Sequence, residues 1–175
     1  MSYTTIIYAV NMEGLKKAFN SQNAQLIQDV FADDVDAARW RLREDGPTLG
    51  QAVEGIVMGT ANFAVTNQLN GYALMRLCEY LGERLPDEDS MGSIESLDVD
   101  SPLAHRRLPI AIEANHDFPF ISFLDEQETE QESKRLAELD LDYAADADIA
   151  LARQAYSDCI QAAAKNRQGV ISFYY

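Results

Sequence analysis

Apolar and β-branched residues are concentrated at both ends of the chain without the spacing of a helix. The stretch YTTIIYAV (residues 3–10) and the closing stretch VISFYY (170–175) both have this composition. Because β-branched and aromatic side chains favour extended backbone, we expect a strand at each terminus. LPIAIEA (108–114) and FPFISFL (118–124) predict two further short strands. Each contains a proline, which suits an edge strand or the start of a strand.

Between these strands, apolar residues recur at helical spacing. We expect a helix over 12–19 that Asn11 caps, and a second that Ser21 opens and that continues through DDVDAARWRLRED (33–45) to Gly46. A third helix follows Thr48, with Gly55 and Gly59 allowing close helix packing. Three more helices are predicted over 70–85, 126–139 and 145–166, the last capped by Asp146 and stopped by Gly169.

This order of elements predicts an α+β fold. We expect one helix-rich globular domain over residues 1–175, with a small mixed sheet that includes the N- and C-terminal strands. Residues 86–107 are polar and irregular and predict a long loop region. A hydrophobic content of 47% with 25% charged residues is typical of a chain that buries a core.

The net charge of −15 changes the range of expected partners. A field of this sign repels phosphates and anionic lipid headgroups, so we expect neither a nucleic acid nor a membrane partner. It attracts a basic protein, although acidity that serves only solubility remains an alternative. The N-terminus lacks a basic region followed by a long apolar run, and no apolar run is long enough to cross a membrane, so we expect a cytoplasmic protein.

Residue types that carry chemistry are sparse. Cys78 and Cys159 lie in helical apolar patterns and are expected to be buried small hydrophobes. The two histidines and two isolated cysteines lack zinc-ligand spacing, and the Asp-x-Asp pairs lack the rest of a calcium loop. The sequence therefore predicts no catalytic residue, no metal site and no cofactor.

The acidic run LDEQETEQESKRLAELDLD (124–142) is the most unusual stretch. Asp125 as N-cap and Glu128 three residues later form the pattern of a capping box, and Glu130 can pair with Lys134 or Arg135. Leu136 and Leu139 are expected to face inward, so a solvated helix explains the run. A docking surface for a basic partner is the alternative. Its candidate contact residues are Glu126, Glu128, Glu130 and Glu132, with Asp87, Glu88 and Asp89 as a second patch.

A second candidate site is cationic. AHRRLP joins His105 to Arg106 and Arg107, the densest positive spot in the chain. With His116 and Tyr72 these residues would make an anion-binding pocket or an enzyme site. Trp40 and the terminal SFYY are expected to be core or sheet-face aromatics, with an exposed docking tail as the alternative.

Three stretches together resemble a known family: the start MSYTTIIYAV, the middle NGYALMRLCEYLGERLP and the end DFPFISFLDEQE with AAAKNRQGVISFYY. The layout is similar to a family of small uncharacterised bacterial proteins described as a domain of unknown function. Its pattern is a Y-A-V strand, a G-Y-A-L helix and a closing G-x-x-x-F-Y strand. The resemblance implies a bacterial, cytoplasmic protein and transfers no active-site residue.

The charge, the small size and the sparse chemistry favour a non-enzymatic protein-binding module. A concrete form is an immunity or antitoxin-like protein that neutralises a basic partner such as a toxin nuclease.

Overall fold

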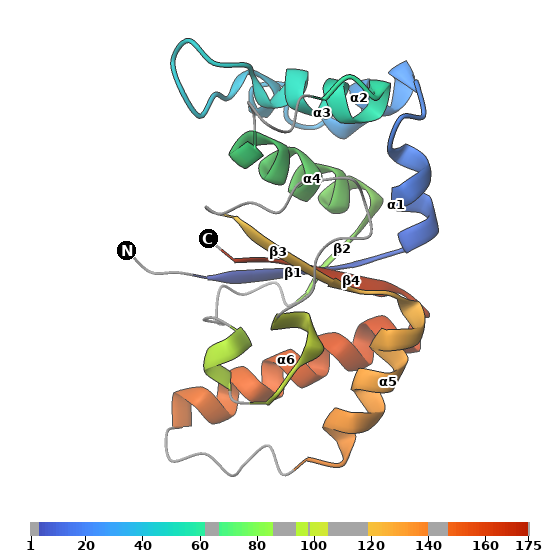
Figure 1. The fold of residues 1–175 in the computed structure, drawn as a ribbon, viewed down its shortest axis with the longest axis vertical. Helices are drawn as coiled ribbons and strands as arrows, with labels where there is room; N and C mark the ends of the chain where they lie inside the picture. Colours follow the sequence, from blue (N-terminus) through green and yellow to red (C-terminus); the bar gives the residue numbers. More distant parts are fainter. Residues whose placement is uncertain are drawn as a thin grey trace.

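A four-stranded antiparallel sheet lies at the centre of the molecule, with helices on both of its faces (Figure 1). The computed structural model describes residues 4–61, 67–85, 94–97, 99–104, 119–139 and 147–174. In chain order, with η for a 3-10 helix, its elements are β1 (Thr5–Val10), α1 (Met12–Ala18), α2 (Ala24–Val30), η1 (Ala37–Arg39), α3 (Leu49–Met58), α4 (Asn67–Leu81), β2 (Gly82–Leu85), η2 (Ile94–Leu97), η3 (Pro102–Ala104), β3 (Phe120–Leu124), α5 (Glu126–Ala137), α6 (Ala147–Lys165) and β4 (Gly169–Tyr174).

The two terminal strands occupy the middle of the sheet. The strand order is β2-β1-β4-β3, and β1 pairs with β4 from Thr5↔Tyr174 to Val10↔Gly169. This pairing confirms the α+β fold with a small sheet built on both ends of the chain. All three strand pairings are antiparallel, whereas the sequence predicted a mixed sheet. β3 lies at an edge directly after Pro119, as the proline predicts.

The alternation of side chains along the strands divides the core into two parts. On β1, Ile6, Tyr8 and Val10 pack against α1–α4, which form the upper layer in Figure 1. Ile7 and Ala9 face the other way and pack with α5, α6, η2 and η3 in the lower layer. Because both faces of the sheet are covered, all six residues of β1 are buried.

Capping side chains set the helix starts. The Asn11 side chain accepts a hydrogen bond from Gly14 N, and Thr48 forms a capping box with Gln51, so both predicted caps are confirmed. The second helix begins later than predicted, because Asn23 and not Ser21 accepts from the first-turn amides of α2. Residues 82–85 leave the predicted long helix and pair with β1 as β2.

The largest difference from the sequence prediction lies between α2 and α3. The predicted helix over 33–45 is wrong: only η1 is helical, and the chain continues as an exposed loop that an isolated bridge, Arg41↔Thr48, closes. Because this segment is an exposed loop, the prediction that Trp40 is a core or sheet-face aromatic is also wrong. In the structure 43% of this residue is exposed.

The two small-residue predictions have different outcomes. Cys78 and Cys159 are buried free thiols, as expected. A Cβ on Gly55 would lie 3.3 Å from the Cα of Ala61, which lies just after α3 and in no helix, so the nearest contact is with its own segment and not the predicted packing of one helix on another. Gly59 instead ends α3 in the left-handed region, with φ of +71°. The predicted strand over 108–114 and the predicted cap Asp146 lie outside the described residues.

Candidate functional site

The acidic stretch forms α5, and its own polar side chains fix where the helix begins. The Asp125 carboxylate accepts from Glu128 N at 2.9 Å, and the Glu128 carboxylate accepts from Asp125 N at 3.0 Å. This is the predicted capping box, and it satisfies two amides that the first turn leaves without helical partners. Glu126 and Glu128 also place negative charge at the positive end of the helix dipole.

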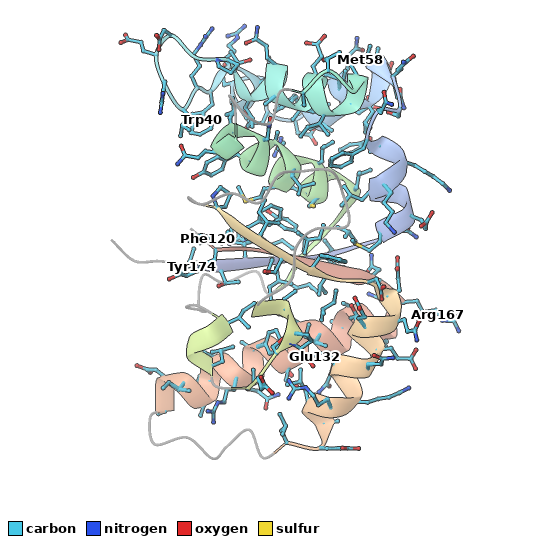
Figure 2. The ribbon with its side chains drawn as sticks, in the orientation of Figure 1. Trp40, Met58, Phe120, Glu132, Arg167 and Tyr174 are labelled. Carbon is cyan, nitrogen blue, oxygen red and sulfur yellow. The ribbon has the colours of Figure 1, made fainter. Side chains whose placement is uncertain are left out.

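The four candidate glutamates of α5 do not share one face. Glu126 accepts a hydrogen bond of 2.9 Å from the backbone amide of Met12, which joins the start of α5 to the start of α1. Glu130 is exposed and pairs with Lys134 at 2.6 Å. Hydrogen bonding to Lys134 lowers the pKa of Glu130. Glu132 points inward, with only 2% of its side chain exposed (Figure 2).

Glu132 is the centre of a buried polar network. Its two carboxylate oxygens accept from Arg135 at 2.7 and 2.8 Å, an arrangement that matches the guanidinium fork. The Tyr156 hydroxyl of α6 donates to Glu132 at 3.1 Å and lies 2.5 Å from the Ser101 hydroxyl oxygen. Ser101 accepts from Leu103 N and so begins η3.

The charges in this network are fixed by their surroundings. Burial raises the pKa of the Tyr156 hydroxyl, and the neighbouring Glu132 carboxylate raises it further, so the phenol stays protonated at neutral pH. Its hydrogen bond with Glu132 raises the pKa of Arg135. A protonated phenol and a carboxylate that is bonded to a guanidinium hold these segments together.

A second contact fastens the same segment to α6. Arg153 Nε donates to the carbonyl of Leu97, and Leu97, Val99 and Leu103 are buried in the lower core. These contacts therefore connect α5 and α6 with Leu97 and Ser101. Sequence reasoning assigned Glu132 to the outer surface and missed Tyr156 and Ser101 as its partners.

The remaining predicted site residues are placed only in part. Asp87, Glu88 and Asp89 of the second acidic patch lie outside the described residues, as do His105, Arg106, Arg107 and His116 of the cationic site. Tyr72 is described: it lies on α4, half-buried, with its ring 5.3 Å from that of Trp40 in an edge-to-face arrangement. Both sites therefore stay predictions.

Residues 33–45 form a surface feature that the sequence prediction missed. Of the seven large hydrophobic residues that the described part of the chain exposes, Val35, Trp40 and Leu42 lie in this one segment. Arg39, Arg41 and Arg43 alternate with Trp40 and Leu42, and all five residues are exposed. We refer to Arg39–Arg43 as the Arg-Trp loop. The alternation of charged and apolar residues at every second position of this loop is the sequence signal that argues against a helix.

In the described part of the chain, no group of three or more histidine, cysteine or acidic side chains could hold a metal ion. A helix long and apolar enough to cross a membrane is likewise absent from the described residues.

Comparison with known families agrees with the resemblance found in the sequence. The model of the family "Domain of unknown function (DUF7691)" matches residues 1–175, and the chain belongs to this family. Searches of curated proteins and of solved structures find no match.

Proposed function

We propose that this protein is a non-enzymatic binding module that engages a basic protein partner through the surface carboxylates of α5. A concrete form of this function is an immunity or antitoxin-like protein that covers a basic partner such as a toxin nuclease. The anion-binding or enzymatic alternative rests on Tyr72 and on residues 105–116.

The observation that carries the proposal is the negative charge of α5, together with the hydrogen bonds that hold its glutamate side chains in place. Residues 125–139 contain six carboxylates and two bases, a net charge of −4. Glu126, Glu128 and Glu130 are each held by a partner within the chain, so their side chains lose less freedom when a partner binds. Fixed negative charge at the surface of α5 speeds the encounter with a basic protein and makes it sensitive to salt.

Three of the predicted contact residues suit this role. Glu126, Glu128 and Glu130 lie at least partly at the surface, whereas Glu132 is inside and belongs to the network with Tyr156. We therefore assign the contact to the first three and a supporting role to Glu132, which holds α5 in place.

The test replaces Glu126, Glu128 and Glu130 together by glutamine. The amide oxygen of glutamine still accepts the bonds from Met12 N and Asp125 N, so the helix start is preserved while the charge is removed. The matched control replaces Glu13, Glu44 and Glu54 by glutamine, an equal change of charge at exposed carboxylates of the upper layer. Pull-downs from a lysate at low and high salt, read by mass spectrometry, compare the two triple variants.

The proposal expects a basic protein that the wild type and the control retain at low salt and that the α5 variant loses. Equal retention by both variants would show that the charge of α5 does not select the partner. An empty pull-down with the wild type at both salts would contradict the binding function itself.

A further inference from the structure

We infer that the Arg-Trp loop is a second binding surface, and that its ligand is a short acidic peptide segment in which carboxylates flank a large apolar side chain. This inference goes beyond the proposed function, because the loop belongs to the upper layer, on the other side of the sheet from α5 (Figures 1 and 2).

The composition of the loop matches the residues that dominate binding energy at protein interfaces. Trp40 is the one tryptophan of the chain, and 43% of it is exposed, as is 40% of Leu42. Tryptophan, tyrosine and arginine are enriched at energetic hot spots. Here the Trp40 ring packs edge-to-face on Tyr72. In the sequence, Trp40 lies between Arg39 and Arg41. An apolar side chain of a ligand would complete the cover of Trp40 and Leu42.

The loop is held in one conformation by its own hydrogen bonds. Leu49 N donates to the carbonyl of Trp40 at 2.8 Å, and Arg41 pairs with Thr48 in an isolated bridge. Arg41 Nη1 donates to the carbonyl of Gly46. A surface that is ordered before binding loses less conformational entropy when a ligand arrives.

The positive charges of the loop arginines favour a ligand that carries carboxylates. Within the described residues, neither Arg41 nor Arg43 has a carboxylate in ion-pair distance, and Arg39 reaches only Asp36, at 3.4 Å. Guanidinium groups bind carboxylates in a two-pronged arrangement. Arg41 and Arg43, which pair with no carboxylate of the described residues, lie on either side of the exposed Leu42 and therefore suit a ligand with acidic and apolar side chains.

The surroundings select a short peptide over a nucleic acid. Asp33, Asp34, Asp36, Glu44 and Asp45 flank the loop, and the whole chain carries −15. These charges repel a continuous line of phosphates. A short segment carries only a few carboxylates and is therefore repelled less than a chain of phosphates.

The single tryptophan provides the measurement. A capped synthetic peptide of alternating glutamate and leucine is titrated into the full chain while the Trp40 emission is recorded. The expected result is a saturable blue shift, because the ligand removes Trp40 from water. Replacing Arg41 and Arg43 together by serine should weaken the affinity about tenfold or more.

Control variants separate the loop from general charge and from α5. Lys16→Ser with Lys17→Ser removes the same charge from exposed positions on α1 of the same layer and should leave the affinity unchanged. The triple glutamine variant of α5 should also leave it unchanged, so that failure of the proposed function and failure of this inference give different results.

Three probes decide the class of ligand. Peptides of alternating lysine and leucine, or of glutamate and serine, should not produce the shift, and nor should a single-stranded DNA oligonucleotide. The inference is overturned if the glutamate–leucine peptide gives no saturable shift, if the Arg41/Arg43 variant binds it as well as the wild type does, or if a control probe binds as tightly.

Discussion

The Tyr156 hydroxyl of α6 donates a hydrogen bond of 3.1 Å to the Glu132 carboxylate of α5, and this bond joins the two helices beneath the sheet. The same carboxylate accepts from Arg135, and the same hydroxyl meets Ser101. Glu132, which lies in an acidic stretch that the sequence predicts to be a solvated helix, is thus the centre of a polar network in the lower layer.

We expect the replacement of Glu132 by alanine to lower the free energy of unfolding by about 2 kcal/mol. The change leaves the Tyr156 hydroxyl and the Arg135 guanidinium without their shared acceptor, although Arg135 is 35% exposed and can turn to water. Urea denaturation measures the loss. Glu130→Ala, which breaks only an exposed pair, should change the free energy by less than about 0.5 kcal/mol. Equal losses for the two variants would contradict the structural role of Glu132.

The pKa of Tyr156 predicts a specific loss of stability in alkali. Its pKa in the folded chain is raised above the ordinary value of 10.0, mainly by burial. The unfolded chain therefore releases this proton first, so the contribution of Tyr156 is complete below pH 10 and is lost as the pH rises above it. The difference in unfolding free energy between wild type and Tyr156→Phe should shrink by about 1.4 kcal/mol per pH unit above that point. A difference that stays constant through this range would show that Tyr156 titrates normally.

The two cysteines should be inert in the folded protein. Burial raises the pKa of Cys78, and it raises that of Cys159 to about 12, so the thiolate is scarce at neutral pH. Because the thiolate is the reactive form, a thiol reagent should label neither residue until the chain unfolds. Gln127→Cys, an exposed position on α5, is the positive control. Labelling of the native wild type as fast as of the control thiol would contradict the burial of both cysteines.

Local signals in the sequence were sufficient for most of the fold. The strands at both ends, the Asn11 and Thr48 caps and the capping box at Asp125 were predicted correctly, because each depends on a few neighbouring residues. Leu136 faces inward as predicted, whereas Leu139 is 41% exposed, since α5 has ended by that residue.

The errors in the predicted elements arose where backbone pairing between strands or bridges replaces helix formation. Residues 33–45 contain good helix formers, but the chain there closes a loop through the pairing of Arg41 with Thr48. Residues 82–85 continue an apolar helical pattern and become a strand because β1 offers an edge for pairing. Glu132 and Tyr156 are 24 positions apart, and Tyr156 and Ser101 are 55 positions apart, separations that no local pattern reveals.

Gly59 is a position where we expect a side chain to be poorly tolerated. Its φ of +71° disfavours any L-residue, and a Cβ there would lie 2.2 Å from Oδ1 of Asn20. Gly59→Ala should therefore lower the free energy of unfolding by about 2 kcal/mol, of which the left-handed backbone accounts for about 1 kcal/mol. Asn20→Gly combined with Gly59→Ala removes the steric conflict and keeps the backbone penalty. Relative to Asn20→Gly alone, this double variant should lose only about 1 kcal/mol, a shift of roughly 2 to 4 °C in Tm. Thermal denaturation of the four chains gives the coupling between the two sites, and a coupling near zero would show that Asn20 moves aside without cost.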